Sequence, residues 1–201
     1  VISIHSTNPG EGKSFSSVNL ATILAMNSKK VLIIGADLRK PRLHKIFNLS
    51  NEHGLSTYLV GLDNVEDIVL PTQIENLFHL PAGPIPPNPS EILSKPELQT
   101  LLETLRPQYD YIIIDNAPTS LVTDGNIVSR LSDLNIFILR YGVSHKHQIE
   151  MINQYVEKKV IDNVAIVVND IKSNSFGSSY YKYYQYESYQ NTYYAEDETG
   201  T

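Results

Sequence analysis

The sequence predicts an α/β fold with a doubly wound, mostly parallel sheet, and two observations lead to that prediction. Runs such as VLIIGAD and YIIID are rich in β-branched residues and apolar at consecutive positions, which is typical of strands covered on both faces. Segments with apolar residues at helical spacing alternate with these runs. Strands that alternate with helices favour a parallel sheet.

The elements follow one another in a regular order. VISIHS (1–6) predicts a strand, a Pro-Gly loop follows it, and KSFSSVNLATILAMN (13–27) predicts the first helix. A second buried strand is expected in 29–37. Further strands are expected in 109–115, 132–141 and 164–170, and further helices in 96–106, after Pro118 and in 144–159.

The stretch from about residue 50 to 95 is less regular. It contains GLSTYLVG, NVEDIVLP, a short predicted strand in NLFHL (76–80) and the proline-rich PAGPIPPNPSEIL (81–93). We expect this stretch to be an ordered excursion over the carboxyl edge of the sheet and not a separate domain.

Composition excludes several classes of function. The 201 residues carry a formal net charge of −6 and no run of Lys or Arg, which argues against sequence-independent binding to nucleic acid. The absence of cysteine excludes disulfides, thiolate zinc sites, iron–sulfur clusters and a cysteine nucleophile. No apolar run is long enough to cross a bilayer and no signal peptide is present, so this stretch of chain is expected to be soluble. Because Val1 lies inside a predicted strand, the natural chain is expected to continue upstream, and that part could contain membrane segments.

A loop with the sequence STNPGEGKS joins the first predicted strand to the first predicted helix, which is the context that a phosphate-binding loop requires. Gly10 and Gly12 allow successive backbone N–H groups to point at one phosphate at the positive end of the helix dipole. Lys13 can reach the β- and γ-phosphates, and the Ser14 hydroxyl can bind Mg²⁺. Thr7 stands where the usual G-x-x-x-x-G-K-[ST] pattern has its first glycine, so the alternative is a glycine-rich surface turn.

Two further predicted strands end on acidic residues. Asp115 ends YIIID, where a carboxylate can hold Mg²⁺ directly or through water. Asp37 and Arg39 follow VLII, at the carboxyl edge where open α/β sheets bind ligands. Taken singly, each aspartate could instead cap a helix or a turn. Together with the loop, they predict a nucleotide site.

The C-terminal stretch has a different composition. SSYYKYYQYESYQNTYY (178–194) places tyrosines among serines, glutamines and charges, with no Leu, Ile, Val or Phe. No face of a helix or strand would stay apolar, so a disordered tail is expected from about Asn174. Taken alone, the tail could be sticky low-complexity sequence with no specific role.

These motifs resemble those of the bacterial tyrosine kinases (BY-kinases) of capsular and exopolysaccharide assembly, which are relatives of the ParA- and MinD-type ATPases. The resemblance spans nearly the whole chain. The matching segments are PGEGKS (9–14) for the loop, VLIIGADLR (31–39) for the A′ motif, IIIDNAP (112–118) for the B motif, and the residues from Tyr180 for the tyrosine cluster. The resemblance implies a P-loop kinase domain over 1–173, a flexible tail over 174–201, and an ATP-dependent protein-tyrosine kinase that uses Mg²⁺.

The resemblance also implies roles for individual residues. Catalytic roles are implied for Lys13, Asp37, Arg39 and Asp115, and Mg²⁺ binding for Ser14, Asp37 and Asp115. Nucleotide contacts are implied for Pro9, Gly10, Glu11, Gly12, Lys13, Ser14, Phe15 and Asn169. For Asn169, which the resemblance places beside the adenine, an ordinary residue at a strand end is an equal alternative.

In this family the tyrosine cluster is phosphorylated in trans by a neighbouring subunit, and the charged tail loosens a ring of subunits that regulates polysaccharide export. The implied acceptors are Tyr180, Tyr181, Tyr183, Tyr184, Tyr186, Tyr189, Tyr193 and Tyr194. The implied partners are copies of the chain in a ring, a membrane polysaccharide co-polymerase or activator that is fused upstream or separate, and a protein-tyrosine phosphatase, with no nucleic acid. The implied location is the cytoplasmic face of the bacterial inner membrane. The proline-rich stretch would shape the subunit contact or the nucleotide edge, or else act as a rigid connector.

One position departs from the family pattern. Gly35 stands where the A′ motif has its first aspartate, which is assigned to accept or orient the proton of the substrate tyrosine. Phosphoryl transfer places little demand on a base, so the change could slow transfer without abolishing it. Alternatively, Asp37 serves both Mg²⁺ and the acceptor, or the chain is a weak kinase. Two other classes therefore stay open: a ParA- or MinD-like ATPase, whose loop has a lysine where Asn8 stands here, and a nucleotide-binding scaffold.

Overall fold

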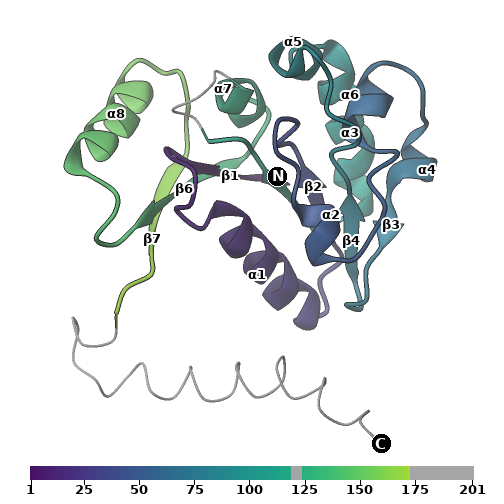
Figure 1. Cartoon of the computed structure of the whole chain (residues 1–201), viewed down its shortest axis with the longest axis horizontal. Coiled ribbons are helices and arrows are strands. Elements are labelled where there is room, and N and C mark those ends of the chain that lie inside the picture. Colours follow the sequence, from purple (N-terminus) through teal and green to yellow (C-terminus); the bar gives the residue numbers. More distant parts are fainter. Residues whose placement is uncertain (119–123, 173–201) are drawn as a thin grey trace, which may run out of the picture. The chain divides into compact units, whose positions relative to one another are not determined.

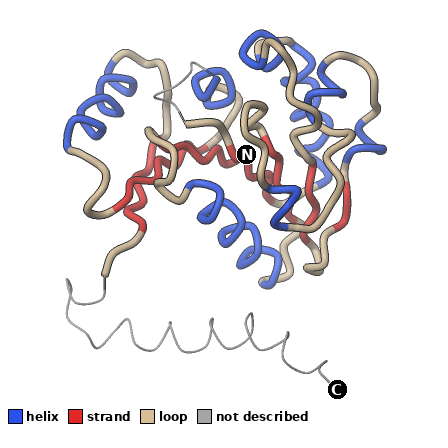
Figure 2. Tube along the Cα trace, viewed as in Figure 1, coloured by secondary structure: helices blue, strands red, loops and turns tan. Residues whose placement is uncertain are grey.

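The computed structural model of the chain describes residues 1–118 and 124–172 (Figure 1, Figure 2). The compact unit that contains the candidate site spans Val1–Asn169. Its elements, in chain order, are β1 (Ile2–Ser6), α1 (Lys13–Met26), β2 (Val31–Gly35), α2 (Leu43–Ile46), α3 (Leu55–Leu59), α4 (Val65–Ile68), β3 (Leu70–Pro71), β4 (Leu77–Leu80), α5 (Pro89–Leu93), α6 (Pro96–Leu105), the 3₁₀ turn η1 (Arg106–Gln108), β5 (Tyr111–Asp115), α7 (Asp124–Ser129), β6 (Leu134–Arg140), α8 (Lys146–Glu157) and β7 (Val164–Asn169).

The strands form one 7-stranded sheet in the order β3-β4-β2-β5-β1-β6-β7. All neighbouring strands pair in parallel except β3 and β4, which pair antiparallel. The predicted doubly wound, mostly parallel sheet is therefore confirmed. Because β5 pairs with both β1 and β2, the carboxyl ends of these three strands lie side by side.

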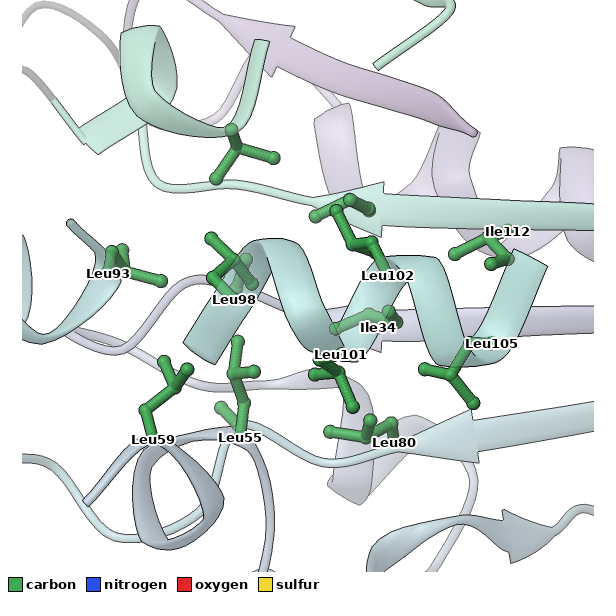
Figure 3. Packing of buried hydrophobic residues seen from close by; sticks show 14 of the residues in the cluster. Ile34, Leu55, Leu59, Leu80, Leu93, Leu98, Leu101, Leu102, Leu105 and Ile112 are labelled. Atoms are coloured by element: carbon green, nitrogen blue, oxygen red, sulfur yellow. The ribbon is translucent and has the colours of Figure 1, made fainter. Parts of the chain in front are cut away.

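Helices cover both faces of the sheet, with α1 on one side and α6, α7 and α8 on the other (Figure 1). Alternate residues of β2 point to opposite faces: Val31 and Ile33 pack with the α1 side, whereas Leu32 and Ile34 pack with the α6 side. Figure 3 shows the leucines of α6 lying over the sheet on that second face. The continuous apolar runs of the sequence are thus explained by burial on both faces.

The middle of the chain differs from the expected excursion over the sheet edge. The short predicted strand in 76–80 is confirmed as β4, but β4 pairs in parallel with β2 inside the sheet. The reason is burial on both faces, since Leu77 packs against the α1 side and Leu80 against the α6 side. The expectation was wrong for β4, whereas α3 and α5 do pack onto the same core, as one domain requires.

The remaining helices lie close to their predicted positions. Within the predicted ranges 96–106 and 144–159 the structure has α6 and α8, and the helix expected after Pro118 includes α7. The predicted boundary between residues 173 and 174 lies outside the described residues and stays a prediction. Among the helices of the described part, none combines the length and apolar character that a membrane crossing needs.

Candidate active site

Three strand ends meet at one open cavity of ≈ 780 Å³. Asp115, at the end of β5, pairs in register with Ile4 of β1 and Gly35 of β2, so the loops after β1 and β2 flank it. The lining residues are Ser6, Pro9, Gly10, Gly12, Lys13, Ser14, Phe15, Asp37, Arg39, Lys40, Arg42, Lys45, Ile46, Asp115, Ala117 and Pro118. The sheet therefore brings together the loop, the A′ segment and the B segment that were singled out in the sequence.

The loop between β1 and α1 needs its glycines for two reasons. Gly10 and Gly12 have φ angles of 83° and 95°, a region that residues with a side chain rarely adopt. A Cβ atom on Gly12 would also lie 2.0 Å from Nδ2 of Asn169. After this turn α1 begins at Lys13, which places the first free N–H groups of the helix at the cavity.

Lys13, Ser14 and Asp115 form a compact polar cluster at the base of the cavity. The Lys13 ammonium donates to Oδ1 of Asp115 at 2.6 Å, and the Ser14 hydroxyl donates to Oδ2 at 2.7 Å. Ser17, one turn further along α1, brings its hydroxyl within 3.1 Å of Oδ1. Both members of the ion pair are almost fully buried, with side chains exposed by 6% and 4%. Partners on every side are what a buried charge pair requires.

Glu11 braces the loop from behind. Its carboxylate is fully buried and accepts from the backbone N–H of Asn8 (2.8 Å), the Ser144 hydroxyl (2.6 Å) and the Gln148 amide (2.8 Å). The amide of Asn169 donates to the Glu11 carbonyl at 3.1 Å. These contacts tie the loop to the start of α8 and the end of β7, so the loop is held without any ligand.

The A′ segment forms the other side of the cavity with fewer internal contacts. Oδ1 of Asp37 accepts the backbone N–H groups of Arg39 and Lys40, at 3.1 and 2.9 Å, which fixes a turn directly after β2. The Arg39 guanidinium donates to the Ser90 hydroxyl at 2.9 Å, so α5 helps to hold it. The proline-rich stretch therefore supports a site residue, in addition to connecting β4 to α6.

Gly35 lies at the end of β2 opposite Asp115. A Cβ atom built at this position would lie 3.2 Å from the backbone nitrogen of Ala82, a close approach that the β4–α5 connection would have to relieve by a small shift. The departure from the family motif is thus accompanied by a neighbouring backbone that packs tightly against the glycine.

Most of the predicted site residues meet at the cavity. Its lining includes Pro9, Gly10, Gly12, Lys13, Ser14, Phe15, Asp37, Arg39 and Asp115. Glu11 and Asn169 do not line it, because their side chains bond to the protein behind the loop. The tyrosines from 180 to 194 lie outside the described residues. The individual roles of all these residues stay predictions.

Other residues at the cavity were missed by sequence reasoning. Ser17 contacts Asp115 because it lies four residues after Lys13, on the same face of α1, and that spacing is visible in the sequence. Lys40, Arg42, Lys45 and Ile46 line the cavity from the A′ turn and α2. No signal pointed to them, because α2 is only four residues long and its place depends on packing of Leu43 against the α1 side.

Two buried histidines lie in the sheet, one in β1 and one in β4. Burial lowers the pKa of His5, in β1 just before the loop, to about 4, and its Nε2 lies 3.0 Å from Oδ1 of Asn135. Burial likewise lowers the pKa of His79, in β4, to about 4, and its Nδ1 lies 3.0 Å from the Ile33 carbonyl oxygen. Both rings are therefore neutral near pH 7.

Comparisons with known proteins give a consistent result. Residues 1–142 match the AAA_31 family, described as an AAA domain. The chain is 40% identical to the tyrosine-protein kinase ptk of Acinetobacter johnsonii over 88% of its length, and 34% identical to the putative tyrosine-protein kinase CapB of Staphylococcus aureus over 90%, covering 79% of CapB. Its fold matches the solved kinase domain of the Escherichia coli tyrosine kinase ETK with a TM-score of 0.82, at 33% identity, over 87% of this chain and 69% of that one.

The extent of these matches differs between relatives. The chain covers 24% of ptk and 25% to 26% of other long relatives, so it spans about a quarter of the length of the first curated relatives it matches. It covers most of CapB. The shared part includes the loop, the A′ segment and the B segment around the cavity.

Proposed function

This chain belongs to the bacterial tyrosine-protein kinases, within the AAA_31 family, and from that premise we propose that it transfers the γ-phosphoryl group of ATP to tyrosine hydroxyls. Its acceptors include the tyrosine cluster of its own C-terminal stretch, presented by a neighbouring copy. The observation that carries the proposal is the cluster of Lys13, Ser14 and Asp115 at the end of the glycine loop, beside a cavity large enough for a nucleotide.

The residues present fit ATP and Mg²⁺. The loop presents backbone N–H groups and Lys13 to a phosphate chain, while the Ser14 hydroxyl and the Asp115 carboxylate supply the hard oxygen ligands that Mg²⁺ prefers. The hydroxyl of Thr7, at the start of the loop, is buried and has no hydrogen-bond partner among the described residues, which leaves it available to a bound group. Asp37 lines the same cavity, and its carboxylate would supply a third oxygen ligand. Bound Mg²⁺ would offset the charge of the β- and γ-phosphate oxygens.

In the proposed reaction, the tyrosine oxygen forms a bond to the γ-phosphorus while the bond from that phosphorus to the bridging oxygen breaks, and ADP leaves. The phenol proton passes to solvent water in the same step. Lys13 stabilises the negative charge on the departing oxygens, and Arg39, held by Ser90, faces the same cavity from the A′ side. Asp37 is the carboxylate of the A′ segment that remains to orient the phenol, since residue 35 is glycine.

The proposed reaction implies several partners. We propose that the C-terminal stretch of one copy enters the site of another, and a closed ring of copies would supply each cavity with such a stretch. The resemblance of the motifs to those of the BY-kinases of capsular and exopolysaccharide assembly adds to the proposal a membrane-bound activator and a role in polysaccharide polymerisation and export at the inner membrane. A protein-tyrosine phosphatase would reverse the modification.

A nucleotide-binding scaffold is the second candidate, and Gly35 is the observation that favours it. The A′ segment lacks one carboxylate, while the nucleotide side of the cavity keeps its full set of contacts. Such a protein would bind ATP and leave the tail unmodified.

Intact-mass spectrometry distinguishes the two candidates. The full chain, treated with phosphatase and repurified, is incubated with Mg²⁺ and ATP beside a Lys13→Met variant. A Lys29→Met variant is the matched control, because Lys29 is exposed in the turn after α1. We expect successive phosphate additions in the wild type and the control, mapping to residues 180–194, and none in Lys13→Met.

An unchanged mass at high protein concentration, with ATP still bound, would contradict the kinase and favour the scaffold. Phosphate additions that persist in Lys13→Met would show that another site transfers phosphate.

A further inference from the structure

The outer part of the cavity carries a concentration of positive charge. Five cationic side chains line the cavity against two acidic ones, although the whole chain has a net charge of −6. Lys13 is paired with Asp115, and Arg39 is bonded to Ser90. The remaining three cations, Lys40, Arg42 and Lys45, are called the basic rim below.

The charges of the basic rim are not used within the domain. All three side chains are exposed, and within residues 1–118 and 124–172 none of them forms an ion pair. Asp37, the nearest acid in sequence, accepts backbone N–H groups of its own turn. An unpaired group of cations at the mouth of a cavity attracts a negatively charged ligand.

Two apolar side chains stand at the same cavity. Phe15, in the first turn of α1, is 64% exposed, and Ile46, at the end of α2, is 53% exposed. The two helices pack on the same face of the sheet, where Leu43 of α2 and Ala21 of α1 belong to one buried cluster. Exposed apolar groups next to unpaired cations suit a ligand that combines an aromatic ring with carboxylates.

We propose that the basic rim selects acceptor tyrosines that stand next to acidic residues. The rim pairs with the carboxylates of the acceptor segment, while Phe15 and Ile46 contact the tyrosine ring. This inference rests on the proposed kinase function and adds the chemical class of the preferred acceptor.

The chain itself contains acceptors of both kinds. Tyr194 is followed by AEDE (195–198), which supplies three carboxylates, whereas Tyr180 and Tyr181 precede Lys182. The rim therefore favours the C-terminal end of the tyrosine cluster over its beginning. A nucleic acid would also carry negative charge, but the net charge of the chain opposes it.

Peptide kinetics test the preference directly. The enzyme is the full chain with its tail tyrosines changed to phenylalanine, so that phosphate enters only the added peptide. One peptide has the sequence of residues 190–201, QNTYYAEDETGT, and the other carries Glu196→Gln, Asp197→Asn and Glu198→Gln. We expect kcat/KM to be roughly 10-fold higher for the acidic peptide, because each exposed pair adds a small gain. The preference should shrink in about 0.5 M salt, which screens exposed charges.

A charge exchange separates recognition from a merely structural effect. Lys40→Glu, Arg42→Glu and Lys45→Glu, combined, should remove the preference and leave the affinity for Mg·ATP unchanged. A third peptide, with lysine at 196, 197 and 198, should then be the better substrate of this variant. Lys29→Glu, Lys158→Glu and Lys159→Glu, combined, are the control, since they reverse three charges at exposed residues that do not line the cavity.

Each outcome has a distinct meaning. Transfer at equal rates to the acidic and neutral peptides would overturn the inference while leaving the kinase function in place. A parallel loss of Mg·ATP affinity in the rim variant would assign the rim to the nucleotide and also overturn the inference, as would a rim-dependent affinity for single-stranded DNA without any peptide preference. Transfer to none of the peptides would instead count against the proposed function.

Discussion

Around one cavity, the loop side binds its charged groups to one another, whereas the A′ side leaves most of its charged groups exposed to solvent. Lys13, Ser14, Ser17 and Asp115 form a buried cluster with every distance at or below 3.1 Å to the carboxylate. Glu11 holds the same loop from behind through three further hydrogen bonds. This side is preorganised before any ligand arrives.

The A′ side has the opposite character. Asp37 fixes its own turn, Gly35 offers no side chain, and the basic rim is exposed and unpaired within the described residues. The difference indicates two roles. The loop side, called the closed side below, holds the phosphate chain rigidly. The A′ side, called the open side, receives an acceptor that varies in sequence. Substitutions and changes of pH can separate the two sides.

Replacing Asp115, the carboxylate at the centre of the closed side, should have the largest effect on phosphotransfer. Asp115→Asn should lower phosphotransfer by about 10³-fold, because Mg²⁺ loses a charged ligand. The buried Lys13 ammonium would lose its partner, so the free energy of unfolding should also fall, by about 3–5 kcal/mol. Kinase assays and chemical denaturation measure the two effects.

Asp162→Asn is the control, because Asp162 is exposed in the connection between α8 and β7. Full activity in Asp115→Asn would refute the assignment of this carboxylate to the metal.

Lowering the pH should reduce the free energy of unfolding, because His5 and His79 are buried in the sheet as neutral rings. The pKa of His5 and of His79 is lowered to about 4 in the folded chain, below the usual value near 6.5. The unfolded chain therefore binds more protons than the folded chain as the pH falls from about 6.5 to 4, and stability is lost in that window. Between pH 6.5 and 5 the expected loss is about 2 kcal/mol for each histidine.

The measurement is the free energy of unfolding at several pH values. His79→Phe should reduce the slope below pH 6.5 by about half, and His147→Gln, which changes an exposed residue of α8, should leave it unaltered. A slope that is the same in His79→Phe and the wild type would show that His79 is not responsible.

Weakening the hydrogen bonds of the Glu11 carboxylate, which brace the loop, should have an intermediate effect on ATP binding and on stability. Glu11→Gln keeps the shape of the side chain but turns one of its oxygens into a donor, which must then face either the Asn8 N–H at the Oε2 position or the donors of Ser144 and Gln148 at the Oε1 position. The loop should lose order, with KM for ATP rising about 10-fold and stability falling by about 1–3 kcal/mol. Ser144→Ala removes one donor to Glu11 and the acceptor of the Arg140 backbone N–H, but leaves the carboxylate in place, so it should show a smaller change in KM in the same direction. An unaltered KM in Glu11→Gln would mean that the brace is dispensable.

Restoring the family carboxylate should have the smallest effect. Gly35→Asp should raise phosphotransfer only a few-fold, roughly 2- to 5-fold, because transfer depends mainly on positioning and charge and Ala82 must shift to make room. Gly35→Asn is the uncharged control of the same size. An increase of about 100-fold or more, in the range of full general-base catalysis, would show that the missing aspartate was limiting.

The sequence was most informative about the closed side. The strand–loop–helix order of STNPGEGKS and the acidic end of YIIID are local patterns, and parallel pairing of β1 with β5 brings them together in a predictable way. The brace could not be predicted, because Ser144 and Gln148 lie more than a hundred residues from Glu11 and carry no motif.

The open side was harder to predict. The cations of the basic rim look like ordinary surface residues in the sequence, and only the packing of the four-residue α2 brings Lys45 and Ile46 to the cavity. The strand β4 was predicted but its place was missed, because its pairing with β2 depends on burial on both faces, which a four-residue run does not reveal.

Transfer of the γ-phosphoryl group from ATP to tyrosine is tested most directly by following that phosphate. A rapid-quench experiment with γ-labelled ATP and the full chain measures ADP, phosphotyrosine and inorganic phosphate at each time. The closed and open sides together predict that phosphotyrosine appears in step with ADP while inorganic phosphate stays near the level of the Lys13→Met variant. Inorganic phosphate in step with ADP, without phosphotyrosine, would instead identify an ATPase and contradict the account.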